Sequence, residues 1–235
     1  MSEPHEFAGP EPRARTRAEL AAIDRDAVER LGLASCCLME NAGAGAAALA
    51  LELLAERGAP RGARVVLLCG RGNNGGDAYV VARHLSLAGA RPWLVHTATS
   101  SSGDAAMMRG ACERMGLEST QCPEGDPAGS ELARLPRPWL VVDGLLGTGP
   151  RGAPRGPAAA PVRWANQAHS DDGRLAARLA LDLPSGLDAD DGSAAEPVFR
   201  ADLTATFAAP KLGFAAPSAG RFLGRVVVVS IGVPG

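Results

Sequence analysis

Short apolar runs alternate with longer segments of mixed polarity through most of the chain. The runs VVLL at 65–68 and WLVV at 139–142 are continuously apolar, which is typical of strands that are buried on both faces. The strands predicted in this way are 64–68, 92–97, 139–142, 179–183, 201–207 and 225–230.

Helices are predicted before and between these strands. Thr16 and Glu19 have the spacing of a capping box, in which each side chain satisfies a backbone group at the start of a helix. The apolar face of that helix would consist of Leu20, Ile23, Ala27 and Leu31. Further helices are predicted at about 36–57, 75–87, 103–115 and 158–168. The helix at 36–57 is rich in small residues, which indicates that another element packs very close to it.

Strands that alternate with helices at this spacing indicate βαβ units. The pattern therefore predicts an α/β fold with three layers and a mainly parallel central sheet. No internal repeat and no linker divides the chain, so we expect a single domain over residues 16–235. Residues 1–15 contain three prolines and charges of both signs, and we expect them to form a flexible N-terminal tail.

Composition excludes several classes of function. The formal net charge is −2 and the arginines are scattered without forming a basic block, so no nucleic-acid partner is expected. No apolar run is expected to reach membrane-spanning length, and the N-terminus lacks the apolar segment of a signal peptide. The five cysteines form neither a CxxC pair nor a disulfide framework, which favours a reducing, cytoplasmic location.

The turn after the first strand, GRGNNGGD at 70–77, is the strongest candidate for a binding site. Glycines that lead into a helix let backbone N–H groups approach a phosphate. The turn has neither the GxGxxG spacing nor the Lys-Ser/Thr ending of a Walker loop. A simple tight turn remains an alternative, although a tight turn does not require the two carboxamides of Asn73 and Asn74.

Polar residues also follow the later strands. Asp143 and Asp182 lie at the ends of apolar runs, Ser185 follows Asp182 by three positions, and Lys211 follows Phe207 by four. Because the carboxyl ends of parallel strands meet at one edge of a sheet, these groups should converge there. The oxygens of Asn74, Asp143 and Ser185 would suit a hard cation, although salt bridges within the protein are an alternative role for the acids. Lysine occurs only at position 211 in an arginine-rich chain, so we expect its ammonium in the site, near the substrate or Asp182.

Five motifs in this order resemble the NAD(P)H-hydrate epimerase family, also called the YjeF N-terminal domain, over residues 16–235. The motifs are LMENAG at 38–43, GRGNNGGDAYVVARHL at 70–85, VVDGLLGTGPRG at 141–152, LDLPSGLDADDG at 181–192 and TATFAAPKLG at 204–213. The resemblance implies a Rossmann-like three-layer α/β/α sandwich. It also implies epimerisation of the R and S forms of hydrated NADH and NADPH, with functional coupling to an NAD(P)H-hydrate dehydratase.

The resemblance also implies roles for individual residues. One potassium ion per subunit would be bound by Asn74, Asp143 and Ser185. Apart from the resemblance, we predict that Asp182 is the catalytic acid or base and that Lys211 assists it. The substrate-binding residues would be Asn73, Asn74, Gly75, Gly76, Asp77, Gly147, Thr148, Gly149, Pro150, Arg151, Gly152, Ala153 and Asp182.

Departures from the family pattern leave alternatives open. Ala78 replaces a usual glycine, and Leu146 and Pro150 stand where an aromatic residue is common, so the loop at 147–153 can grip its ligand differently. The other interpretations are a non-catalytic nucleotide-, RNA- or protein-binding module and an ordinary NAD-dependent dehydrogenase. A homodimer is possible, and the chain is either a stand-alone epimerase or one half of a fusion with a dehydratase.

Overall fold

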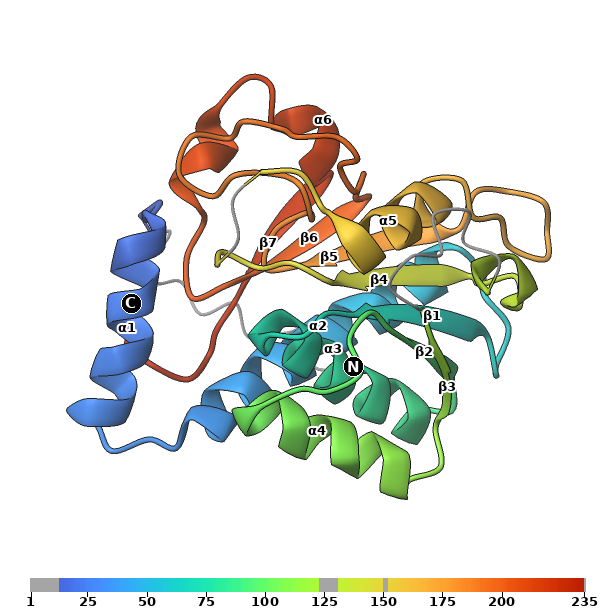
Figure 1. The fold of residues 1–235 in the computed structure, drawn as a ribbon, viewed down its shortest axis with the longest axis horizontal. Coiled ribbons are helices and arrows are strands. Elements are labelled where there is room, and N and C mark those ends of the chain that lie inside the picture. Colours follow the sequence, from blue (N-terminus) through green and yellow to red (C-terminus); the bar gives the residue numbers. More distant parts are fainter. Residues whose placement is uncertain (1–12, 123–130, 150–151, 235) are drawn as a thin grey trace, which may run out of the picture.

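A single parallel sheet forms the centre of the molecule (Figure 1). The computed structural model describes residues 13–122, 131–149 and 152–234. Within these residues the sheet has seven strands in the order β3-β2-β1-β4-β5-β6-β7, and every neighbouring pair is parallel. The strands are β1 (Arg64–Cys69), β2 (Arg91–His96), β3 (Glu118–Gln121), β4 (Leu140–Gly144), β5 (Ala177–Leu181), β6 (Leu203–Phe207) and β7 (Arg225–Val229).

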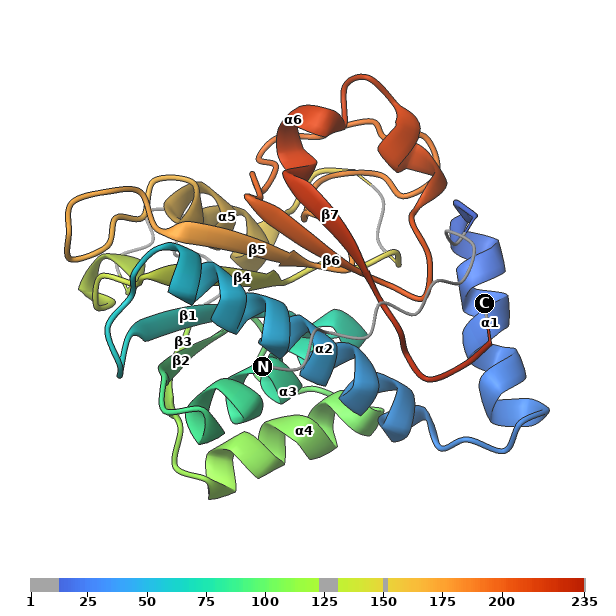
Figure 2. The ribbon, with the colours of Figure 1, turned by 180° about the vertical axis from the view of Figure 1, so that it is seen from behind.

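Helices cover both faces of this sheet, which confirms the predicted three-layer Rossmann-like fold. The helices are α1 (Arg17–Glu29), α2 (Ser35–Glu56), α3 (Asn73–Leu87), α4 (Gly103–Arg114), α5 (Ala159–Ala165) and α6 (Gly220–Leu223), with short 3-10 turns η1 (Leu132–Arg134), η2 (Gly156–Ala158) and η3 (Leu212–Ala215). Figures 1 and 2 show α2, α3 and α4 on one face and α5 on the other. Separate apolar clusters fill the two interfaces between the sheet and the helices.

The predicted element boundaries differ from the structure in a few places. Strand β3 was not predicted because its sequence, ESTQ, is polar and lies at the edge of the sheet. Helix α3 begins at Asn73, two residues before the predicted start, so both asparagines belong to its first turn. Helix α5 ends at Ala165, three residues before the predicted end at 168.

Helix α2 packs against α3 at very short range. A Cβ atom added to Gly43 would lie 2.4 Å from the Cβ of Val80 on α3, so only glycine fits at this contact. By length and composition α2 could cross a membrane, which corrects the expectation that no apolar run is long enough. Just over half of its most apolar window is buried inside the protein, as expected for a core helix.

The N-terminal segment is attached to the domain before α1 begins. The backbone N–H of Arg15 donates to Pro210, and the carbonyl of Arg15 accepts from Leu212, in an isolated parallel bridge beside Lys211. Residue 15 is therefore fixed to the strand-end region, although it falls within the expected flexible tail. Residues 1–12 of that expected tail lie outside the described residues.

The order of the strands determines where a ligand can enter. The chain winds outward from β1 through β2 to β3, then returns to β4 on the other side of β1. The connections that leave β1 and β4 therefore diverge and open a crevice at the carboxyl ends of these strands. The segments after β1, β4, β5 and β6 all meet at this crevice.

Candidate active site

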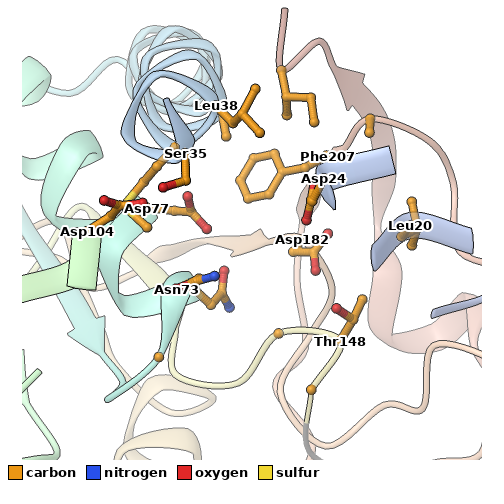
Figure 3. A pocket seen from close by; sticks show the side chains of 18 of the residues that line it. Leu20, Asp24, Ser35, Leu38, Asn73, Asp77, Asp104, Thr148, Asp182 and Phe207 are labelled. Carbon is orange, nitrogen blue, oxygen red and sulfur yellow. The ribbon is translucent and has the colours of Figure 1, made fainter. Parts of the chain in front are cut away.

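A cavity of about 520 Å³ occupies the crevice at the carboxyl ends of the strands (Figure 3). Its walls come from α1, α2, the start of α3, and the segments that follow β4, β5 and β6. Apolar side chains such as Leu38 and Phe207 line one part of it, and carboxyl groups line another. A volume of this size suits a small-molecule ligand or a part of a larger one.

The Gly-rich turn brings α3 close to the strand ends. A Cβ atom on Gly75 would lie 2.0 Å from the carbonyl oxygen of Gly70, so a side chain at this position would collide with the backbone. Asn73, Asn74 and Asp77 face the cavity, whereas Gly75 is buried behind this wall. The glycines therefore permit the close approach that aims the N-terminus of α3 at a ligand.

Asp143 and Ser185 form a hydrogen-bonded pair behind the cavity. The Asp143 carboxylate is fully buried, and it accepts hydrogen bonds from the Ser185 hydroxyl (2.8 Å), the Ser185 N–H (2.8 Å) and the Leu145 N–H (3.1 Å). Burial nevertheless raises the pKa of Asp143 to about 6, since the hydrogen bonds offset only part of the desolvation.

Asn74 lies close to the loop that follows Asp143, since a Cβ atom added to Gly147 would lie 3.4 Å from the Cβ of Asn74. Its side chain is 7% exposed, and neither its carboxamide oxygen nor its nitrogen has a hydrogen-bond partner in the described part of the chain. A buried amide that lacks a partner within the protein is costly, so its surroundings suit contact with a ligand. The oxygens of Asn74, Asp143 and Ser185 therefore fit a cation that prefers neutral oxygen ligands. Among the described residues no cluster of three or more His, Cys, Asp or Glu side chains could hold a metal ion.

Asp182 and Lys211 form an ion pair at the cavity wall. The Lys211 ammonium contacts Oδ1 of Asp182, and it also donates to the carbonyl oxygens of Phe207 (3.1 Å) and Ala209 (3.3 Å). Lysine 211 is 1% exposed, and these three partners use all three of its N–H groups. Its geometry is therefore that of a residue that positions Asp182, while Oδ2 of Asp182 remains on the cavity side.

The strand ends that carry this pair have an unusual backbone. Asp182 has φ = 68° and Ala208 has φ = 62°, the left-handed region that residues other than glycine rarely adopt. Both residues line the cavity. Strain of this kind is held in place by the surrounding structure and is concentrated at functional sites.

Asp77 is the most deeply buried acid that faces the cavity. It is 7% exposed, and its carboxyl group has no hydrogen-bond or ion-pair partner within the described residues. Burial raises the pKa of Asp77 well above its usual range, and the nearby carboxylates of Asp182 and Asp24 raise it further, against an opposing effect from Lys211. Asp77 therefore favours its protonated form in the substrate-free protein.

The loop after β4 lies only partly at the cavity. Gly147, Thr148 and Gly149 line it. Pro150 and Arg151, which the resemblance places among the substrate-binding residues, lie outside the described residues. The remaining residues expected to bind substrate, Gly76, Gly152 and Ala153, do not line the cavity in this structure.

Sequence reasoning missed the contribution of the first helix. Leu20, Asp24 and Val28 of α1 line the cavity, and Asp24 faces Asp182 (Figure 3). Their spacing of four residues was a usable signal, because positions i, i+4 and i+8 share one face of a helix. Leu31 was placed on the buried face, but it lies beyond the end of α1 and is 39% exposed.

Arg17 attaches the start of α1 to two of the cavity loops. Its guanidinium donates to the carbonyl of Gly149 (2.9 Å) and to the carboxylate of Asp188 (3.1 Å). Its backbone N–H donates to Asp190 (2.8 Å). These contacts fix the start of α1 against the segments that follow β4 and β5.

Comparison with known proteins identifies relatives that are similar to this chain in sequence over most of its length. A protein of Rhodopirellula baltica named NAD(P)H-hydrate epimerase is 46% identical over 90% of this chain and 81% of its own length. A protein of Pirellula staleyi with the same name is 36% identical over 90% of this chain and 89% of its own length. The bifunctional NAD(P)H-hydrate repair enzyme Nnr of Salinibacter ruber is 39% identical over 95% of this chain, which spans 41% of that longer protein.

A solved structure and a family model agree with these relatives. The crystal structure of yeast ynu0 superposes with a TM-score of 0.72 over 86% of this chain and 82% of the yeast chain, at 23% identity, and so supports the fold. The model of the YjeF-related protein N-terminus family matches residues 35–213, which include every strand except β7. The chain thus belongs to the YjeF-related protein N-terminus family.

Proposed function

We propose that this protein is an NAD(P)H-hydrate epimerase, which interconverts the R and S epimers of hydrated NADH and NADPH. The names of its relatives in Rhodopirellula baltica and Pirellula staleyi support this activity. The observation that carries it on this chain is the Asp182–Lys211 ion pair, which presents a carboxylate with a free oxygen to a cavity of about 520 Å³. A module that only binds ligands would have no need for this buried pair.

The chemistry of the substrate explains why an acid–base group is needed. The hydrated nicotinamide ring carries a hydroxyl group on C6, and C6 is bonded to the ring nitrogen. Either reversible loss of this hydroxyl or reversible ring opening erases the configuration at C6, and both require proton transfer at the oxygen. Asp182 is positioned by Lys211 to perform that transfer.

The dinucleotide would lie along the two Gly-containing segments. The N-terminus of α3, with residues 73–77, offers N–H groups and a favourable dipole to the phosphates. Residues 147–153 would form the facing wall, with Gly147, Thr148 and Gly149 in contact with the cavity. Apolar contacts from Leu38 and Phe207 would cover the rest of the ligand.

A potassium ion would be held by Asn74, Asp143 and Ser185. The support on this chain is the carboxamide of Asn74, which is buried without a partner. Only one of the three groups is an acid, which suits a monovalent ion better than Ca²⁺ or Mg²⁺. When bound, such an ion would supply positive charge beside the substrate site and would tie together the segments after β1, β4 and β5.

The proposed activity also indicates a partner enzyme and a compartment for this protein. Epimerisation makes both epimers available to an NAD(P)H-hydrate dehydratase, and the relatives named bifunctional repair enzymes are consistent with that coupling. We place the protein in the cytoplasm, where its substrates are, and we include a homodimer as a state to be tested by light scattering. The proposed activity requires neither a nucleic acid nor a membrane.

The test of the proposed function is exchange between purified epimers of hydrated NADH. Chromatography or NMR should show acceleration over the spontaneous rate with the folded protein in potassium chloride. Asp182→Asn should reduce that acceleration by ~10²–10⁴-fold, the usual contribution of an acid–base group. If the wild-type protein causes no acceleration, the proposed activity is wrong.

A further inference from the structure

Asp77 is a buried carboxyl group to which the reaction described above assigns no chemical step. It is 7% exposed, it has no hydrogen-bond or ion-pair partner within the described residues, and it lines the same cavity as Asp182. Leaving a buried polar group without a partner costs free energy. Nothing in the packing of α3 requires an acid here, so the group points to a ligand in the cavity.

Asp77 and Asp182 enter the cavity from opposite walls (Figure 3). Asp77 comes from the second turn of α3, which follows β1. Asp182 comes from the end of β5, on the far side of β4. A flat ring bound between these walls would present one face to each carboxyl group.

Inversion at one ring carbon by loss and return of water has a strict geometric requirement. The oxygen leaves from one face of the ring and a water molecule adds to the other face. A proton must therefore be given on the first face and taken on the second, and a single side chain cannot reach both. This reasoning rests on the proposed epimerase activity.

We propose that Asp77 is the second acid–base group of the epimerisation and acts on the ring face opposite to Asp182. In one direction the Asp77 carboxylic acid protonates the hydroxyl on C6. The C6–O bond breaks, water leaves, and the lone pair of the ring nitrogen forms a C=N bond. A water molecule then adds to C6 from the other face, the C=N electrons return to nitrogen, and Asp182 takes the proton from that water.

The step is balanced and reversible. Asp77 becomes ionised and Asp182 becomes protonated, so the product state is ready for the reverse reaction, and exchange with solvent resets the pair. No electrons are transferred to an external acceptor. The cationic ring of the intermediate would lie among the carboxylates of Asp24, Asp77 and Asp182, which stabilise positive charge.

The surroundings of the two groups agree with this division of work. Burial, Asp182 and Asp24 together raise the pKa of Asp77, which suits the role of a proton donor. Asp182 contacts the Lys211 ammonium, an arrangement that suits a proton acceptor. These different surroundings match an acid role for Asp77 and a base role for Asp182, as in other pairs of carboxyl groups with opposite roles.

The first test is Asp77→Asn, which keeps the shape of the side chain and removes the transferable proton. We expect kcat to fall by ~10²–10⁴-fold in both directions, since the equilibrium between epimers is unchanged. The KM should change by less than about threefold, because Asn retains the polar contacts that bind substrate. Thermal melting should show a folded variant, since the asparagine side chain keeps the shape of the aspartate and carries no charge.

Asp26→Asn is the matched control, because it removes one carboxylate from α1 at a site outside the cavity, where Asp26 pairs with Arg30. Its kcat should equal that of the wild type. If Asp77→Asn retains wild-type kcat while Asp182→Asn loses it, then Asp77 is not the second group and the epimerase assignment stands. If the wild type itself is inactive, the assignment fails first.

The second test uses the wild-type protein and does not depend on the folding of a variant. In water labelled with ¹⁸O, each epimerisation should place one solvent oxygen on C6, because the leaving and entering waters occupy opposite faces. Mass spectrometry of both epimers measures this ratio directly. If the epimers interconvert faster than ¹⁸O is incorporated, the original oxygen is retained, as in ring opening. That result would overturn the proposal.

Discussion

At the scale of single residues, the site contains charged groups that a hydrophobic core normally excludes. Asp143 is fully buried and Lys211 is 1% exposed, but each has three polar partners. These contacts replace much of the lost hydration. Asp77 and Asn74 have no such compensation, and for that reason we assign them to ligands.

Lys211→Arg tests whether the ammonium positions Asp182. A guanidinium is planar and larger, so it cannot occupy the buried position between two carbonyl groups and Asp182 in the same way. We expect kcat to fall at least about tenfold with little change in KM, because the carboxylate is displaced by a fraction of an ångström. Steady-state kinetics measures both constants.

Arg114→Lys is the corresponding exchange on an exposed part of α4, and it should leave both constants unchanged. A wild-type kcat for Lys211→Arg would show that any buried cation suffices at this position. In that case the single lysine of the chain would have no catalytic significance.

At the scale of secondary structure, the contact between α2 and α3 positions the reacting groups. The two helices approach through Gly43, whose Cα faces Val80, and a Cβ there would also lie 3.1 Å from the carbonyl oxygen of Asp77. Asn74 and Asp77 both belong to α3, so the distance at which α3 packs against α2 determines where these side chains lie at the cavity. The abundance of small residues in α2 is therefore part of the site.

Gly43→Ala should destabilise the protein by about 1–3 kcal/mol, the usual cost of adding a methyl group to a well-packed contact. Urea denaturation measures the change. Gly220→Ala is the control, because the first position of α6 has open space around the added atom. Equal stability of the two variants would show that α2 and α3 can move apart without cost. It would also remove the packing argument for the position of Asp77.

At the scale of the whole molecule, the cation cluster joins parts of the chain that are distant in sequence. Asn74 follows β1, Asp143 ends β4, and Ser185 follows β5. The cluster exists only when these strands are assembled, so an ion bound there binds the folded state alone. Such binding stabilises the fold by RT ln(1 + [L]/Kd).

We therefore expect a higher Tm in potassium chloride than in choline chloride at equal ionic strength. At ten times Kd the gain is about 1.4 kcal/mol, which corresponds to a rise of about 3–6 °C for a domain of this size. Differential scanning calorimetry measures it. Asp143→Asn and Asn74→Ala should each lose the difference between the two salts, whatever their own stability. Identical wild-type curves in both salts would mean that the oxygens have a structural role only.

The sequence by itself determined the class of fold and the segments that form the site. Continuous apolar runs such as Val65–Leu68 can only be buried between two layers, so the parallel three-layer arrangement follows from local pattern. The motifs at 70–77, 141–152 and 181–192 come directly after strands, and the geometry of parallel sheets sends them to one edge. These two inferences require only the pattern of apolar residues over short segments and the common direction of parallel strands.

Tertiary structure alone decided which groups in those segments are partnered. Asp77 resembles an ordinary residue of a helix start in the sequence, and only the packing of α2 on α3 makes it a buried acid without a partner. Asp24 is 158 positions from Asp182, and their approach depends on how Arg17 fixes the start of α1 against the segments that follow β4 and β5. Burial and pairing depend on contacts between distant segments, and these contacts set the protonation of each acid.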